Sequence, residues 1–202
     1  MNDAFTYSNQ LTSDWGIDGT VLRFSDRGNY LAYSCFNGGS LQSLCIAPLT
    51  SPTTIGTTSV ISTPTSTWET HSGSVNEGPA ALYHGGKTYL AFSASSCWTN
   101  YYALGLLTWN GSGDPAKSSS WSKKGPVLSS ANGNYGTGHN GFFTSPDGTE
   151  TWNVFHAVAN SAGACDGTRY AVAKKMTWAS DGSPVFTPPE TLGTTLTGPA
   201  GE

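Results

Sequence analysis

The sequence has 202 residues, a net charge of −4 and only 11% charged residues. This length is enough for one domain with a sizeable core. The nine Lys and Arg residues are scattered, so we expect no nucleic-acid partner. No apolar run approaches the roughly 18 residues of a membrane-spanning helix, so we also expect no membrane partner.

No segment of about 12 residues shows a helical apolar period, which predicts an all-β fold. One pattern of a polar bend, an apolar run, a turn and a second apolar run occurs three times, over residues 18–33, 77–92 and 139–155. In the middle copy, Gly85 and Gly86 join the two runs, as in a β-hairpin. A third strand-like run follows each hairpin.

The repeat divides a single domain, residues 1–202, into units at roughly 15–70, 75–130 and 137–190. A fixed period with about four short strands per unit is typical of a β-propeller. A closed propeller usually has about four to eight blades. We therefore expect part of a ring, or a ring completed by another copy through its open strand edges.

Each unit places one polar side chain at the start of its first strand. These are Asp18, Glu77 and His139, which are 59 and 62 residues apart. The first strands of propeller blades line the central channel. The spacing therefore predicts that the three side chains converge on one face.

The four cysteines, Cys35, Cys45, Cys97 and Cys165, allow three pairings. Cys35 and Cys45 lie on adjacent predicted strands, which makes that bridge plausible, and buried free thiols are the alternative. No Cys or His spacing predicts a zinc site.

Several ordered motifs resemble glycoside hydrolase family 43. They are Trp15-Gly16-Ile17-Asp18-Gly19-Thr20, Trp68-Glu69, Val75-Asn76-Glu77-Gly78-Pro79, Gly138-His139-Asn140-Gly141 and Pro146-Asp147-Gly148. Family members are five-bladed β-propellers that hydrolyse arabinosides and xylosides with inversion. The resemblance implies about three of five blades, and an N-terminally truncated catalytic domain.

The resemblance implies roles for individual residues. Glu77 matches the general acid, and Asp18 matches the carboxylate that raises the pKa of that acid and orients it. His139 matches a channel histidine that contacts the sugar and holds a calcium ion, directly or through water. Asn76 and Arg169 are expected to contact the sugar. No organic cofactor is implied.

Two tryptophans are expected to add to this site. Trp15 and Trp98 are candidate sugar platforms, and core packing is the alternative. The run Ser93–Trp98, with Trp15–Ile17, is more similar to arabinofuranosidases than to xylosidases. We therefore expect an α-L-arabinofuranosidase-like enzyme acting on arabinose-containing plant polysaccharides or oligosaccharides.

The general base of the family should lie about two blades before Asp18. Asp3 and Asp14 precede Asp18, but neither lies at the start of a predicted strand. We therefore expect weak or no hydrolysis by this chain, because loss of the base costs about 10²–10⁴-fold in rate. The alternatives are a non-catalytic carbohydrate-binding fragment and a self-assembling propeller fragment.

The expected location is extracellular for the full-length parent. A Ser- and Thr-rich composition and one glycosylation sequon, Asn110-Gly111-Ser112, favour secretion. Residues 1–10 lack the basic and apolar regions of a signal peptide, so we expect none in this chain.

Overall fold

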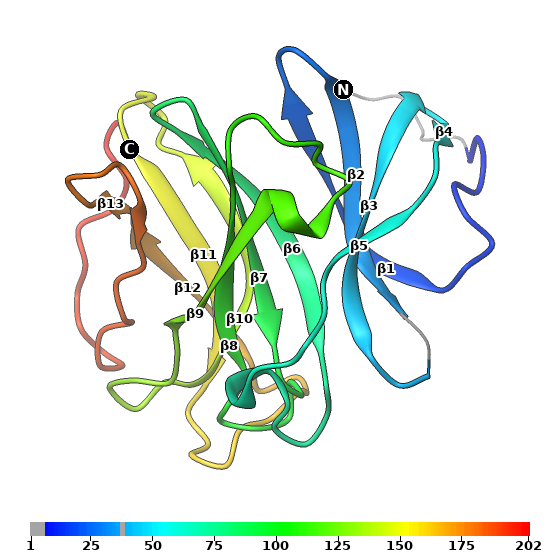
Figure 1. The fold of residues 1–202 in the computed structure, drawn as a ribbon. Coiled ribbons are helices and arrows are strands. Elements are labelled where there is room, and N and C mark those ends of the chain that lie inside the picture. Colours follow the sequence, from blue (N-terminus) through cyan, green and yellow to red (C-terminus); the bar gives the residue numbers. More distant parts are fainter. Residues whose placement is uncertain (1–6, 37–38) are drawn as a thin grey trace.

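The computed structural model describes residues 7–36 and 39–202, and regular structure in these ranges is almost entirely β-strand (Figure 1). The helical segments of this described part are single 3-10 turns, η1 (Thr67–Glu69) and η2 (Ser118–Ser120). Neither has the length or apolar character needed to cross a bilayer. The predicted all-β fold class is confirmed.

Three antiparallel sheets follow one another along the chain in the order of the predicted repeat units, and the third begins at Tyr135, before the predicted start of its unit at residue 137. The first sheet contains β1 (Gly16–Phe24), β2 (Gly28–Phe36), β3 (Gln42–Ser51), β4 (Thr54–Ile55) and β5 (Ser59–Ser62). The second contains β6 (Asn76–His84), β7 (Lys87–Ala94), β8 (Ala103–Trp109) and β9 (Trp121–Leu128). The third contains β10 (Tyr135–Thr144), β11 (Thr151–Val158) and β12 (Tyr170–Lys175), and a separate pair is formed by β13 (Thr177–Trp178) and β14 (Pro184–Val185).

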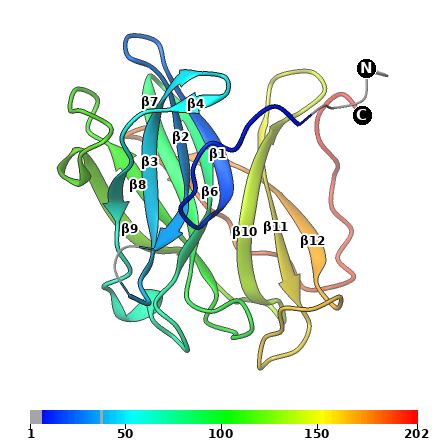
Figure 2. The same cartoon turned by 90° about the vertical axis from the view of Figure 1, so that its right-hand side faces the viewer.

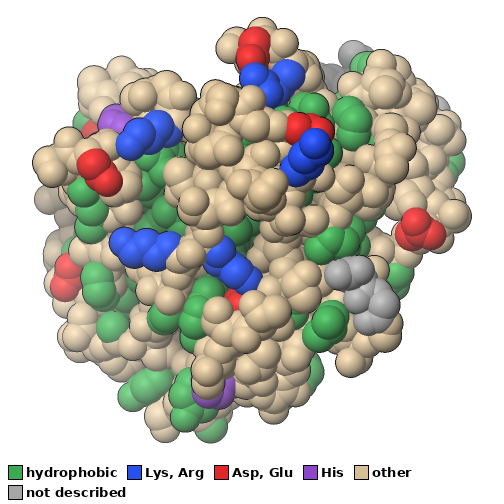
Figure 3. Space-filling model, viewed as in Figure 1, with side chains coloured by type: hydrophobic (Ala, Val, Ile, Leu, Met, Phe, Trp, Pro, Cys, Tyr) green, Lys and Arg blue, Asp and Glu red, His purple; other side chains and the backbone are tan. Residues whose placement is uncertain are grey.

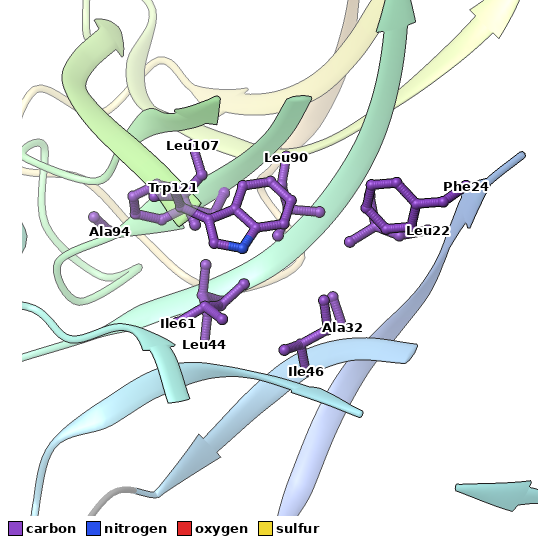
Figure 4. Packing of buried hydrophobic residues seen from close by; sticks show 11 residues of the cluster. Leu22, Phe24, Ala32, Leu44, Ile46, Ile61, Leu90, Ala94, Leu107 and Trp121 are labelled. Atoms are coloured by element: carbon purple, nitrogen blue, oxygen red, sulfur yellow. The ribbon is translucent and has the colours of Figure 1, made fainter. Parts of the chain in front are cut away.

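The second sheet is packed on both faces, which explains why β7 is apolar along its length. Successive strand residues point to opposite faces. Leu90 and Phe92 of β7 therefore belong to a buried cluster with Leu22 and Ile46 of the first sheet. Figure 4 shows Leu90 among the residues of the first sheet in this cluster. This contact between two sheets is the larger core of the described part of the chain.

The other face of β7 packs toward the third sheet. Tyr89 and Ala91 lie in a second buried cluster with Leu104, Phe155 and Met176. The three sheets are thus stacked like neighbouring blades, with β6 between β1 and β10 (Figure 2). Burial on both sides of the middle blade fixes the positions of the three inner strands.

A β-bulge interrupts each inner strand at the same place. The pairing register shifts between Ile17 and Thr20, between Glu77 and Ala80, and between Gly138 and Gly141. In each bulge one residue has a positive φ angle: 59° at Asp18, 55° at Gly78 and 53° at His139. The predicted equivalence of Glu77 with Asp18 and His139 is therefore wrong by one residue, because the bulge aligns Gly78 with them.

Both cysteine pairs are bonded. Cys35–Cys45 joins β2 to β3, and Cys97–Cys165 joins the loop after β7 to the loop before β12. The second bond crosses from the middle sheet to the third sheet. No cysteine is free, so the free-thiol alternative is wrong.

Charged side chains are sparse on the surface. On the face shown in Figure 3, Lys and Arg side chains occur in small separate groups among neutral residues. The absence of nucleic-acid and membrane partners stays a prediction.

Candidate active site

The three inner strands line an open cavity of about 350 Å³. Its walls come from the bulged parts of β1, β6 and β10, including Asp18, Gly78 and His139. Residues distant in sequence thus meet in one channel. The structure brings together two of the three predicted polar side chains at this cavity, and Glu77 lies one residue outside its wall.

Asp18 is held by the neighbouring inner strand. The Gly78 N–H donates a hydrogen bond of 3.1 Å to Asp18 Oδ2, and His139 Nε2 lies 3.7 Å from Asp18 Oδ1. Gly78 allows this approach, because a Cβ atom there would lie 3.3 Å from His139 Nδ1. A residue with a side chain would also be strained at this positive φ angle.

Glu77 is partly exposed and is held at both carboxylate oxygens. Gln42 Nε2 donates to Oε2 at 3.1 Å, and the Tyr102 hydroxyl donates to Oε1 at 2.8 Å. These donors come from β3 and from the loop before β8. Sequence reasoning missed both, because neither lies in the motifs that surround Glu77.

Tyr102 is fully buried and also reaches His139. Its hydroxyl oxygen lies 3.3 Å from His139 Nδ1. The ring fits because Gly138 has no side chain; a Cβ atom there would lie 2.6 Å from Tyr102 Cδ1. Burial, followed by the charge of Glu77, raises the pKa of Tyr102 well above its usual value. The hydroxyl therefore keeps its proton and acts as a donor.

A second cavity of about 420 Å³ adjoins the first at His139. His156 and Arg169 also line it, and the expected contact of Arg169 with the sugar stays a prediction. Burial, then the charges of Arg169 and His139, lowers the pKa of His156 to about 4. Neither ring nitrogen of His156 has a hydrogen-bond partner in the described part of the chain.

Asn76 does not face the channel. Its side chain is completely buried, donates to Glu69 Oε1 at 2.9 Å and accepts from Ser62 Oγ at 3.0 Å. The expected sugar contact by Asn76 is corrected by this placement, because its amide is engaged in the interior. Asn76 instead anchors the start of β6, next to Glu77.

The same anchor contains a buried carboxylate. Glu69 is 0% exposed and lies 2.8 Å from Lys123 Nζ. Burial raises the pKa of Glu69, but hydrogen bonds from Lys123, Ser66 and Asn76 outweigh it, so the pKa is lower than usual. The charged Glu69 carboxylate therefore holds the segment before β6 in place through its bonds to Ser66, Asn76 and Lys123.

The two predicted aromatic platforms lie outside both cavities. Trp15 is 45% exposed and packs on Phe36 with ring centroids 4.5 Å apart. Trp98 is 58% exposed and directly follows Cys97. Their contact with sugar stays a prediction.

The described part of the chain places one carboxylate beside the expected calcium position at His139. Calcium in proteins takes about six to eight oxygen ligands. Near the His139 ring the structure places one carboxylate, Asp18, and residues 7–36 and 39–202 contain no group of three His, Cys, Asp or Glu suited to a metal. Calcium binding at His139, directly or through water, stays a prediction.

The general base is not identified in the described part of the chain. Asp14 is exposed before β1 and does not line either cavity, and Asp3 lies outside the described residues. Asp18 is the carboxylate in the cavity wall. The chain thus presents an acid candidate and a neighbouring carboxylate.

Comparison with known proteins is consistent with this geometry. A sequence profile of the family "Glycosyl hydrolases family 43" matches residues 2–184. An extracellular exo-α-(1→5)-L-arabinofuranosidase of Streptomyces avermitilis is 42% identical over 161 residues, covering 76% of this chain and 33% of the relative. α-L-arabinofuranosidase 43 of Humicola insolens is 36% identical over 156 residues, covering 73% and 32%.

Solved structures give the same result. The α-L-arabinofuranosidase of Lactobacillus brevis superposes with a TM-score of 0.82 at 29% identity, covering 90% of this chain and 58% of that one. The chain spans about a third of the length of the Streptomyces avermitilis and Humicola insolens relatives. With the profile match over residues 2–184 and these relatives, the chain belongs to glycosyl hydrolase family 43.

Proposed function

We propose that the protein containing this chain is an α-L-arabinofuranosidase, and that this chain supplies its general acid, Glu77. The observation that carries the proposal is the placement of Glu77, which is held at both oxygens one residue before Gly78, the donor to Asp18. The relatives from Streptomyces avermitilis and Humicola insolens are named arabinofuranosidases, which supports an arabinose-containing carbohydrate substrate.

The proposed reaction is hydrolysis with inversion. Glu77 gives its proton to the glycosidic oxygen, which takes the electrons of the breaking carbon–oxygen bond. Water attacks the anomeric carbon from the opposite face and loses its proton to a carboxylate base. Asp18 orients the acid through the hydrogen bond that it accepts from the Gly78 N–H, next to Glu77 in the chain. We propose that the base comes from another part of the ring or from another copy.

We propose that the protein works outside the cell. One relative is named extracellular, and this chain has two disulfide bonds. Such bonds persist in oxidising compartments and are rare in the cytosol.

The first test is hydrolysis of an aryl α-L-arabinofuranoside by the purified chain at high enzyme concentration. We expect slow turnover that falls by about 10²-fold or more in Glu77→Gln, because the proton donor is lost. Glu190→Gln is the matched control, since Glu190 pairs with Lys174 in the third sheet. Equal turnover by the wild type and Glu77→Gln would contradict the role of Glu77.

A second function, carbohydrate binding without turnover, is favoured by one surface feature. Tyr101 is 56% exposed near Trp98, and its ring stacks on His71 with centroids 3.9 Å apart. Exposed flat rings of this kind bind sugar faces. Calorimetry with arabinan tests this function: binding lost in Trp98→Ala, with no turnover by the wild type, would favour it over hydrolysis.

Self-association is a further proposal about partners. The third sheet has three strands, so β12 is an edge strand with unpaired backbone groups on one side. Such an edge can pair with a second copy. Analytical ultracentrifugation across a concentration series tests it, and a monomer at all concentrations would contradict it.

A further inference from the structure

Hydrogen bonds and one longer contact link Glu77 to Asp18 through Tyr102 and His139. Glu77 Oε1 accepts from the Tyr102 hydroxyl at 2.8 Å, and that hydroxyl lies 3.3 Å from His139 Nδ1. His139 Nε2 faces Asp18 Oδ1 at 3.7 Å, and Asp18 accepts from the Gly78 N–H, next to Glu77 in the chain. The two carboxylates are thus connected through Tyr102 and His139 as well as through the backbone.

The Tyr102 hydroxyl has one proton and two possible acceptors, Glu77 Oε1 and His139 Nδ1. A proton on His139 Nε2 is favoured because that nitrogen faces the carboxylate of Asp18. His139 Nδ1 is then an acceptor, like Glu77 Oε1. The Tyr102 hydroxyl has a single O–H, so it can donate to only one of them at a time.

The charge on Glu77 decides which acceptor receives the bond. Hydrogen bonds to a charged carboxylate are shorter and roughly twice as strong as neutral ones. An ionised Glu77 therefore receives the hydrogen bond of the Tyr102 hydroxyl. In the structure the Tyr102 oxygen lies 2.8 Å from Glu77 Oε1 and 3.3 Å from His139 Nδ1. A neutral Glu77 loses this advantage, and the hydroxyl is free to turn to His139.

We propose that Tyr102 is a positioning residue whose hydroxyl alternates between His139 Nδ1 and Glu77 Oε1 during turnover. The inference rests on the proposed role of Glu77 as general acid. While Glu77 holds its proton, Tyr102 donates to His139. As that proton passes to the leaving oxygen, Tyr102 turns to the carboxylate that forms. Tyr102 keeps its own proton throughout.

The surroundings of Tyr102 suit this role. The side chain is fully buried, so water does not compete for its hydroxyl. The raised pKa of Tyr102 keeps the hydroxyl protonated. Its ring stacks on His156 with an interplanar angle of 4°, and Ser93 Oγ accepts from the His139 backbone N–H at 2.6 Å. Stacking on His156 holds the Tyr102 ring in place, and rotation about the bond between the ring and the hydroxyl oxygen can point the proton to either acceptor.

The spectroscopic test uses Glu77→Gln to imitate the neutral acid in the full chain. Gln42 Nε2 donates to Glu77 Oε2, so the amide oxygen of the new side chain should face Gln42 and its NH₂ group should face Tyr102. That NH₂ group donates to the Tyr102 oxygen and directs the hydroxyl proton to His139 Nδ1. The readout is the ¹⁵N shift of the His139 ring, assigned by its loss in His139→Gln.

We expect the Nδ1 signal to move upfield in Glu77→Gln relative to the wild type, because it gains a hydrogen bond. The movement should vanish when Tyr102→Phe is added. Tyr89→Phe is the matched control, since Tyr89 is equally buried and its hydroxyl donates to the Gly182 carbonyl. No change in Glu77→Gln, or a change that survives Tyr102→Phe, would overturn the proposal. This readout needs no turnover, so it is independent of the proposed hydrolysis.

A kinetic test follows the leaving group. The Tyr102 bond to Glu77 strengthens only as the proton departs, so it matters most for leaving groups that need protonation. Tyr102→Phe should lower kcat/KM about tenfold or more for an alkyl arabinofuranoside and much less for a dinitrophenyl arabinofuranoside. Tyr89→Phe should leave both unchanged. Equal losses on the two substrates would show a merely structural effect and overturn the proposal.

Discussion

Replacing Lys123 with Met should lower the free energy of unfolding, because it leaves the buried carboxylate of Glu69 without its cation. Lys123 Nζ contacts both carboxylate oxygens of Glu69, at 2.8 Å and 2.9 Å, and Glu69 is 0% exposed. Removing one partner of a buried ion pair costs about 3–5 kcal/mol, because the remaining charge is uncompensated. Since the Lys123 side chain is 23% exposed, we expect the lower end, about 3 kcal/mol.

Urea unfolding at pH 7, followed by tryptophan fluorescence, measures this loss. For a chain of this size, about 3 kcal/mol corresponds to a melting temperature roughly 6–12 °C lower. Lys124→Met is the matched control, because Lys124 is the next residue on β9 and is exposed. Adding Glu69→Gln to Lys123→Met should restore part of the stability by removing the isolated charge.

The dependence on pH gives a second check on the same variant. The pKa of Glu69 is lowered in the folded chain, so its stabilising effect is present above the unfolded pKa of about 4.3 and is lost as the pH falls. The stability difference between the wild type and Lys123→Met should therefore narrow below about pH 4. A difference under about 1 kcal/mol at pH 7, or one that grows in acid, would refute the reasoning.

The remaining predictions concern the disulfide bonds and His156. Cys97–Cys165 closes a loop of 68 residues and Cys35–Cys45 a loop of 10, so replacing each pair with Ala should lower the unfolding free energy by about 4 and about 3 kcal/mol, respectively. Chemical denaturation measures both, and a larger loss for the short loop would contradict the loop-length argument. His156 has a pKa of about 4 when folded and about 6.5 when unfolded, so the unfolded chain binds more protons between these values and stability rises with pH across this window. His156→Gln should flatten that rise by roughly 1–2 kcal/mol, a value reduced because the ring is partly exposed; parallel stability curves for the two proteins would argue against it.

The strand pattern was predictable because it depends on local sequence. Gly85 and Gly86 adopt φ angles of 55° and 75°, as a tight hairpin turn requires, and the apolar runs on either side become β6 and β7. Each of the three sheets begins with an antiparallel hairpin, although the turns differ in length. Repetition of a locally determined unit therefore revealed the fold class.

The position of the bulges was not predictable, and this produced the error of one residue at Glu77. A bulge inserts one extra residue into a strand, and the letters alone do not show which residue it is. Asp18 and Glu77 align by chemical type, whereas Asp18 and Gly78 align by backbone conformation. Similarity of side chains was therefore a misleading guide to register.

The sequence motifs allow the inward direction of Asn76 to be predicted, but not that of Tyr102. Neighbouring strand residues point to opposite faces. A partly exposed Glu77 therefore signals that Asn76 points inward, and this signal was available in the sequence. Tyr101 and Tyr102 are identical letters with exposures of 56% and 0%. Tyr102, which reaches Glu77, differs from the exposed Tyr101 only because residues of separate sheets pack around it, and this packing is not visible in the local sequence.

The positive φ angles at the three bulges restrict which residues this channel can use. Among residues other than glycine, Asn, Asp and His adopt this left-handed conformation most readily, and β-branched residues rarely do. The chain has Asp18, Gly78 and His139 at these positions. Backbone shape thus selects a short list of residue types: a carboxylate, an amide, an imidazole or no side chain. Variants of the channel chemistry are best sought by exchanging these types among the three positions, since the strands already provide the conformation that each of them requires.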